Sequence, residues 1–253
     1  PVKFEPRLAE LRVDQDAIDK EFDLLIKEND LNEEEKNQIS QKAGKLSNLL
    51  KAPKRMEAIS QDIKEHFLTH VNPKGLKAMV VVYDRQACVL MYNLLTKSLG
   101  EGTCEVVMNI SQGSISDHDN ANVNQIKQSS DWIKWNDLGL KISKEDFRRW
   151  QQIDANSSNQ EQLLDKYKDS NNKLKILIVT SKLLTGFDAP ICYCMYLDKP
   201  LRDHNLLQSI CRTNRPYDQR KKNGLIIDYL GVFENLARAL SYDPKEIEGV
   251  VDQ

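Results

Sequence analysis

Five short apolar runs, rich in β-branched and other aliphatic residues, recur along the last two thirds of the chain. Such continuous runs are typical of parallel strands that are buried on both faces. The expected strands are 77–83, 105–108, 174–179, 192–197 and 224–228. Segments with apolar residues at helical spacing lie between them, at 86–98, 160–169, 203–212 and 231–241. Alternating strands and helices predict an α/β fold, a parallel sheet with helices on both faces.

The beginning of the chain has a polar, helical pattern. Residues 1–72 place apolar side chains three and four positions apart, which predicts two to four amphipathic helices. One of these helices follows Pro53, and its apolar residues are Met56, Ile59, Ile63, Phe67 and Leu68. We therefore expect a helical segment or linker over 1–75, an α/β domain over 76–242 and a C-terminal extension over 243–253.

A stretch rich in Ser, Asn, Gln and Asp, about 110–160, interrupts the alternation of strands and helices. It contains all three tryptophans, Trp132, Trp135 and Trp150. We expect a surface insertion with one or two short helices, which the tryptophans pack against the rest of the domain.

Composition excludes several classes of protein. With 40% hydrophobic residues and a net charge of −2, the 253 residues are not a disordered chain. The longest apolar stretch, 76–83, is far shorter than the roughly 20 residues that span a bilayer. Five cysteines without a CxxC pair, and no leader at the start, indicate a reducing, cytoplasmic location. Because the chain begins with Pro1 rather than Met, we expect a fragment of a longer protein.

The sequence lacks the motifs that bind nucleotides or metals on their own. Neither GxxxxGK[ST] nor GxGxxG occurs, and no GxSxG marks a serine hydrolase. His66 and His70 are four residues apart without a third ligand nearby, so no metal site is predicted. A small-molecule enzyme that uses Asp228 at a strand end stays an alternative, although no cofactor motif accompanies it.

Polar residues follow the strand expected at 174–179. Thr180 and Ser181 can offer hydroxyl and backbone NH groups to a phosphate, and Gly186 permits close approach of the backbone. Asp188 can orient an arginine or a ribose hydroxyl. An ordinary turn between a strand and the next element would explain the same residues.

Two arginines stand at the end of the helix expected at 203–212. Arg212 and Arg215 are three residues apart, so their planar guanidinium groups project in nearly the same direction and could clamp a phosphoryl group. Alternatively, they could simply neutralise the negative end of the helix dipole.

Together these residues resemble two motifs of superfamily 2 helicases and translocases. TxxxxxGxD of motif V falls on Thr180, Gly186 and Asp188, and QxxxRxxR of motif VI falls on Gln208, Arg212 and Arg215. The strand at 77–83 suits motif IV. More narrowly, the chain resembles the R subunit (HsdR) of type I restriction endonucleases. That likeness is carried by FEPRLAEL at 4–11, LLKAPKR at 49–55, KAMVVVYDRQA at 77–87, LTGFDAP at 184–190, MYLDKPL at 195–201 and IIDYLG at 226–231.

The resemblance implies a second RecA-like motor domain, with a separate role for each matching residue. Arg215 would be the arginine finger, with Arg212 as a second contact to the γ-phosphate and Gln208 beside them. Gly186 and Asp188 would complete the nucleotide side of the cleft. The residues expected to contact DNA phosphates are Thr180, Ser181, Asp84, Arg85 and Gln86. Cys211 stands where many superfamily 2 proteins have Gly, a change between small residues that keeps the arginines in register.

The same resemblance implies that the parent protein is an ATP-dependent translocase and a site-specific deoxyribonuclease. Its ATP and Mg²⁺ would be bound mainly by a first motor domain, so we expect no tightly bound cofactor and no activity in this fragment alone. The implied partners are double-stranded DNA, that first motor domain, and the modification and specificity subunits. Two alternatives stay open: a motor domain of another superfamily 2 helicase, and a RecA-like interaction module that binds no nucleotide.

Overall fold

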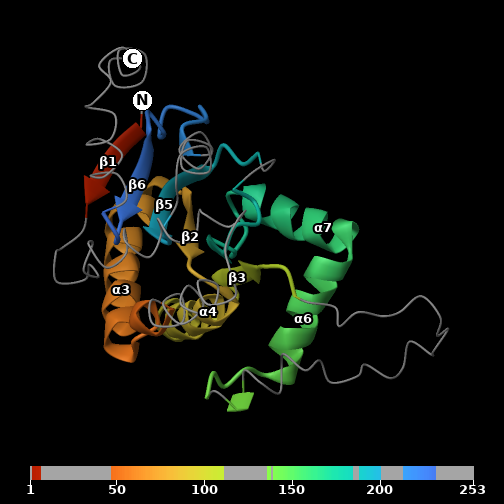
Figure 1. Ribbon diagram of the computed structural model, residues 1–253. Coiled ribbons are helices and arrows are strands. Elements are labelled where there is room, and N and C mark those ends of the chain that lie inside the picture. Colours follow the sequence, from red (N-terminus) through yellow and green to blue (C-terminus); the bar gives the residue numbers. More distant parts are fainter. Residues whose placement is uncertain are drawn as a thin grey trace, which may run out of the picture.

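The computed structural model describes residues 2–6, 47–110, 136–137, 139–184, 188–200 and 213–231. Six parallel strands form one sheet, in the order β1-β6-β5-β2-β4-β3 (Figure 1). The strands are β1 Val2–Pro6, β2 Lys77–Val82, β3 Cys104–Val107, β4 Ile176–Val179, β5 Cys192–Asp198 and β6 Gly224–Asp228. The parallel α/β class and the five expected strands are therefore confirmed, with ends that differ by one or two residues.

The centre of the sheet is β2, which pairs with β4 on one side and with β5 on the other. All six of its residues are buried, as are all residues of β4 and β5. This burial on both faces explains why these strands are continuous apolar runs rather than alternating ones.

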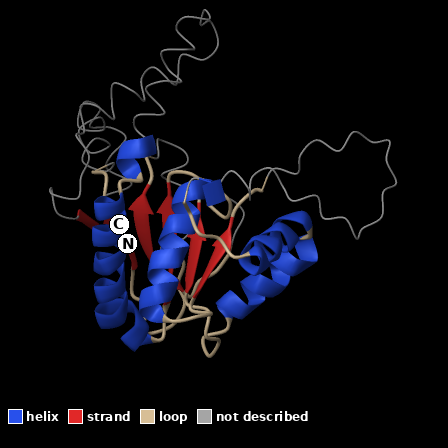
Figure 2. Ribbon diagram, turned by 90° about the horizontal axis from the view of Figure 1, so that it is seen from below, coloured by secondary structure: helices blue, strands red, loops and turns tan. Residues whose placement is uncertain are grey.

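Two helices lie side by side over one face of the sheet (Figure 2). These are α3, Pro53–His66, and α4, Arg85–Leu99, both within one or two residues of the segments that the sequence predicted. Helix α3 has a proline at its first position, which suits the fixed φ of that residue, and turns Met56, Ile59 and Ile63 into the core. It continues into a π-helical turn, Phe67–Val71, and a 3₁₀ turn, Asn72–Lys74.

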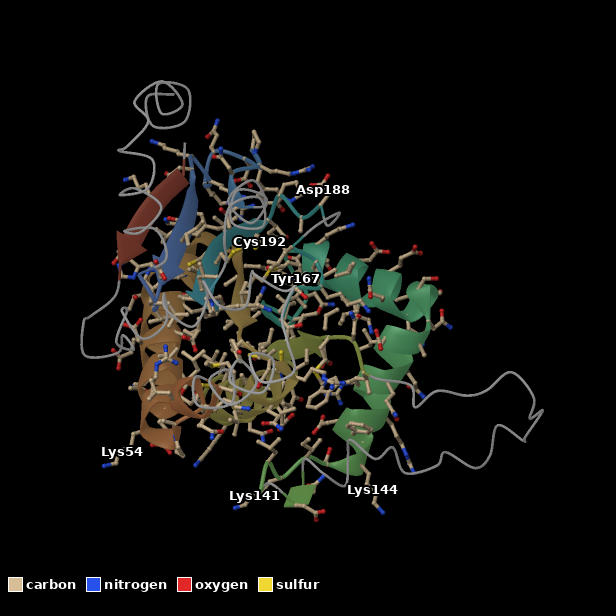
Figure 3. All side chains as sticks on the ribbon, viewed as in Figure 1. Lys54, Lys141, Lys144, Tyr167, Asp188 and Cys192 are labelled. Carbon is tan, nitrogen blue, oxygen red and sulfur yellow. The ribbon has the colours of Figure 1, made fainter. Side chains whose placement is uncertain are left out.

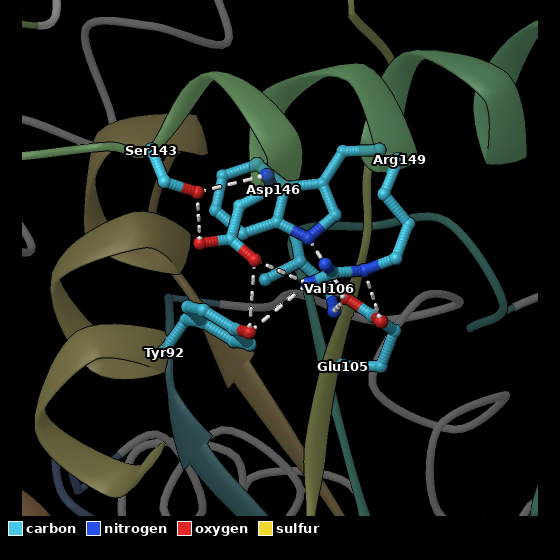
Figure 4. Close-up of polar contacts among 7 residues, drawn as sticks. Tyr92, Glu105, Val106, Ser143, Asp146 and Arg149 are labelled. Carbon is cyan, nitrogen blue, oxygen red and sulfur yellow. Dashed lines mark hydrogen bonds and ion pairs between the residues drawn. The ribbon is translucent and has the colours of Figure 1, made fainter. Parts of the chain in front are cut away.

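The described part of the insertion contains the helix α6, Lys144–Ala155. The helix predicted at 160–169 is α7, Ser157–Lys168, which directly follows it. Trp150 is buried, packs edge-on against Tyr92 of α4 and donates a hydrogen bond of 2.8 Å to Glu105 of β3. Arg149 forms an ion pair with the same carboxylate at 2.8 Å and also bonds Asp146 and the Tyr92 hydroxyl (Figure 4). Trp150 thus packs the insertion against the domain as expected, while Trp132 and Trp135 lie outside the described residues.

The buried Lys77 at the start of β2 ties the end of α7 to the sheet. Its ammonium donates hydrogen bonds to the carbonyls of Asp169 at 2.5 Å and Lys166 at 3.2 Å. Burial, with Lys175 nearby, lowers the pKa of Lys77 to about 8. Tyr167 of α7 is also buried and donates to the carbonyl of Ala78 at 2.8 Å.

The helical interpretation of residues 1–72 is wrong at its beginning. Val2–Pro6 forms β1, which pairs in parallel with β6 at the edge of the sheet. Its partner lies more than 200 residues away in the sequence, so no local periodicity could reveal the pairing. The helices predicted at 203–212 and 231–241 lie outside the described residues, apart from Gly231. Among the described residues, no helix has both the length and the apolar character needed to cross a membrane.

Replacing Trp150 with alanine should lower the free energy of unfolding by about 3–5 kcal/mol, because a buried indole is lost and the buried Glu105 loses a donor. Chemical denaturation followed by circular dichroism would measure the change. The matched control is Arg148→Ala, an exposed position on the same helix. Equal stability of the two variants would contradict the packing described for α6.

Candidate functional site

The residues singled out by sequence fall into two groups at opposite ends of the strands. Thr180 and Ser181 directly follow β4, and Asp84, Arg85 and Gln86 follow β2. Because β2 and β4 are parallel neighbours, both groups of residues lie at the carboxyl edge of the sheet. This is the edge at which open α/β sheets bind their ligands.

The second group lies toward the amino ends of β5 and β6. Asp188 precedes β5 by four residues, and Arg215 lies in the segment that leads into β6. The two side chains form an ion pair with 2.8 Å between Nη1 of Arg215 and Oδ1 of Asp188. Figure 3 shows Asp188 on the same side of the molecule as Cys192 and far from Lys54 at the start of α3. The structure therefore joins the carboxylate of the first motif to the final arginine of the second.

Both members of this pair are partly exposed, with 43% of the Arg215 side chain and 58% of the Asp188 side chain accessible to solvent. Exposed ion pairs contribute about 0–1 kcal/mol. A phosphate can therefore compete with the carboxylate for the guanidinium, which binds either anion through the same planar donors. The other residues expected here, Gly186, Gln208 and Arg212, lie outside the described residues.

At the carboxyl edge, the carboxylate of Asp84 already has several donors. It caps α4 by accepting a hydrogen bond of 2.8 Å from the backbone NH of Ala87. Its other oxygen accepts from Lys51 at 2.8 Å and from Ser47 at 3.1 Å. Lys51 also donates to the side-chain oxygen of Gln86 at 2.5 Å. Two residues expected to contact DNA are thus held by a lysine that precedes α3.

A second cation from the same stretch reaches the neighbouring strand end. Arg55 binds both oxygens of Asp198, at 3.0 and 2.5 Å, and donates to the carbonyl of Leu50 at 3.0 Å. The side chains of Arg55 and Asp198 are only 10% and 3% exposed. Next to this pair, burial lowers the pKa of Lys199.

These contacts lie between β2 and β5, where the order in which the chain adds strands to the sheet reverses. From β2 the chain continues toward β3, and from β5 it continues toward β6 on the other side. Such a switch point opens a crevice at the carboxyl ends of neighbouring strands. Sequence reasoning did not assign Lys51, Arg55 or Asp198 to this edge. The available signal was their presence in the LLKAPKR and MYLDKPL segments.

The loop after β4 is tied to the insertion. Lys182 forms an ion pair with Asp154 of α6 at 2.7 Å, and Asp154 also accepts a hydrogen bond of 2.7 Å from the backbone NH of Ile110. Both side chains are largely buried. The end of α6 therefore fixes the segments that follow β3 and β4.

The residues considered for other chemistry make structural contacts. His66 is buried, lies 2.7 Å from the hydroxyl of Tyr196 and stacks on His70. The buried Asp228 accepts hydrogen bonds from the backbone NH groups of Leu230 and Gly231. Within the described ranges, no three His, Cys, Asp or Glu side chains gather as metal ligands would.

Comparison with known proteins establishes the family. Residues 74–231, more than half of the chain, match the family model for domain 3 of the type I restriction enzyme subunit R. The chain belongs to this family of R subunit domains. Membership agrees with the narrower resemblance noted in the sequence and decides against a motor domain of another superfamily 2 helicase.

Relatives of known name are much longer proteins. The HindI endonuclease subunit of the type I restriction enzyme from Haemophilus influenzae is 32% identical over 89% of this chain and 18% of its own length. The MjaIXP endonuclease subunit of Methanocaldococcus jannaschii, named as a candidate type I enzyme, is 31% identical over 95% of this chain and 20% of its own length. The chain thus spans about a fifth of these relatives.

A solved fragment of a candidate HsdR subunit from Vibrio vulnificus YJ016 is 15% identical to this chain. The superposition covers 72% of this chain and 29% of the solved chain, with a TM-score of 0.43.

Replacing Arg55 with methionine should lower the free energy of unfolding by about 3–5 kcal/mol, because Asp198 would keep a buried charge without its partner. Denaturant titration of the chain would measure this loss. Lys54→Met, at the exposed neighbouring position, is the matched control and should be nearly neutral. If the pair is buried as described, adding Asp198→Leu to Arg55→Met should recover most of the stability.

Proposed function

We propose that this chain is the second RecA-like motor domain of a type I restriction enzyme R subunit. In the full-length protein it would serve ATP-driven translocation along double-stranded DNA. The observation that carries the proposal is the contact between Asp188 and Arg215, which unites the two helicase-like motifs in a chain of this family.

Arg215 acts as the arginine finger in this proposal. Such a residue neutralises charge that develops on the transferring phosphoryl group and can contribute a factor of about 10³ to 10⁵ in rate. Asp188 holds the guanidinium until a γ-phosphate replaces the carboxylate. Arg212 would make a second phosphate contact, with Gln208 beside it and Gly186 allowing close approach of the backbone.

The nucleotide itself would come from a neighbouring domain. ATP with Mg²⁺ would be bound mainly by the first motor domain of the same R subunit, and this chain would add its arginine side to the cleft. An arginine finger acts only when a nucleotide is presented to it, so the 253-residue chain alone should have no appreciable ATPase, translocase or nuclease activity.

The carboxyl edge is proposed to contact DNA. Thr180, Ser181, Arg85 and Gln86 would donate hydrogen bonds to phosphates, which lets a motor step along any sequence. Asp84 would contribute indirectly, because its carboxylate caps α4 and accepts from Lys51.

The remaining activities belong to other parts of the proposed assembly. The nuclease would lie elsewhere in the R subunit, and the specificity subunit would recognise the DNA sequence. Together with the modification subunit, these parts would form the site-specific deoxyribonuclease.

Arg215→Ala in the full-length R subunit should abolish most of the DNA-stimulated ATP hydrolysis, by about 10³-fold or more, while ATP binding persists. Turnover in the assembled complex and separate nucleotide-binding titrations would measure the two effects. Exposed Arg220, which bonds Asp218, supplies the control Arg220→Ala. Unchanged turnover in Arg215→Ala would exclude this role and favour a RecA-like module that takes no part in hydrolysis.

Arg85→Ala should weaken DNA binding by the full-length R subunit to a similar degree for all sequences. If Arg85 contacts one phosphate, the slope of log affinity against log salt should become shallower by about 1. Binding to two unrelated duplexes across a range of salt concentrations would test this. A loss confined to one sequence, or an unchanged slope, would place Arg85 away from the phosphates.

A further inference from the structure

The two ends of the segment that carries Arg215 pack against each other. It runs from Thr213, whose side chain is buried, to Gly224 at the start of β6. A Cβ atom on Gly224 would lie 2.5 Å from the carbonyl oxygen of Thr213, so only glycine permits this approach of the two backbones. The two ends of the segment are therefore in direct contact.

A buried lysine ties this segment to the one that carries Asp188. The ammonium group of Lys221 donates hydrogen bonds to the carbonyl of Pro190 at 2.6 Å and to the carbonyl of Cys192 at 2.8 Å. Those carbonyls lie two and four residues after Asp188, where β5 begins. Lys221 is only 5% exposed, and burial lowers its pKa to about 8.

Burying the Lys221 ammonium beside the carbonyls of Pro190 and Cys192 carries a desolvation penalty. A buried ammonium loses its hydration, and only hydrogen bonds in good geometry compensate for that loss. The exposed ion pair between Asp188 and Arg215 is too weak to fix two loops by itself. The close approach at Gly224 closes the Arg215 segment, and the two Lys221 hydrogen bonds join that segment to the Asp188 segment through a buried group.

We propose that Lys221 is a positioning residue for phosphoryl transfer, holding the Arg215 segment against the Asp188 segment so that the guanidinium is in place when the γ-phosphate arrives. The inference rests on the proposed function of Arg215. Lys221 touches neither nucleotide nor DNA in this proposal, and acts through the loops that it joins.

The test uses the full-length R subunit in its complex with the modification and specificity subunits. Lys221→Met keeps the length of the side chain but removes its donors, and exposed Lys222→Met is the matched control. We expect Lys221→Met to lower kcat for DNA-stimulated ATP hydrolysis by about 10- to 100-fold, the cost of a misplaced catalytic group. KM for ATP should stay within about twofold, since another domain binds the nucleotide.

A second comparison separates positioning from a general structural defect. Both lysine variants are combined with Arg215→Ala, and the residual rates are measured in single turnover. If Lys221 acts through Arg215, Lys221→Met should cause no further loss in that background. An equal loss in both backgrounds would overturn the inference, and so would a Lys221→Met variant that behaves like Lys222→Met.

The two proposals fail in different ways. Unchanged turnover in Arg215→Ala alone would refute the proposed function and the inference together. A large loss in Arg215→Ala without one in Lys221→Met would refute only the inference. If Lys221→Met does not fold, Lys221→Gln takes its place: its NH₂ group is polar, but its side chain is one atom too short to reach both carbonyls with the loops in place. A loss of kcat that requires Arg215 would support positioning, and no loss would refute it.

Discussion

The parallel pairing of β2 with β4 and β5 is the constraint on which the other features of this structure depend. Parallel strands place all of their carboxyl ends at one edge and all of their amino ends at the other. A loop that follows a strand and a loop that precedes one are therefore separated by the length of the strand. This separation puts Thr180 and Asp84 at one edge, and Asp188 and Arg215 toward the other. In the proposed motor, DNA would bind at the first of these edges and the nucleotide near the second.

Buried and half-buried cations fix the loops at both edges. Lys51 and Arg55 bind the ends of β2 and β5, Lys182 binds the end of α6, and Lys221 binds the start of β5. Each contact joins segments that are 28 to 143 residues apart in the sequence. A charged group in such surroundings needs partners in good geometry, so each contact restricts how its loop can be placed.

In the proposed function, the site is one half of a cleft that another domain of the R subunit completes. The chain spans about a fifth of its named relatives, and it supplies an arginine and a carboxylate rather than a phosphate-binding loop. In that role, the guanidinium would stabilise charge that develops on a nucleotide bound by the other domain. The pair of Arg215 with Asp188 is exposed and weak, so in the proposed role the guanidinium could leave the carboxylate for a phosphate.

Local sequence patterns determined strands β2 to β6, helices α3 and α4, and the two motifs. Burial on both faces of a strand leaves a continuous apolar run in the sequence, and burial on one side of a helix leaves apolar residues at helical spacing. The same patterns could not reveal β1, whose five residues depend on β6 for their partners. Nor could they assign Lys51, Arg55 or Lys221, since a lysine or arginine looks alike in sequence whether it faces water or a carboxylate far along the chain. Only the tertiary structure decided those partners, because the desolvation that makes such contacts specific arises when distant segments pack together.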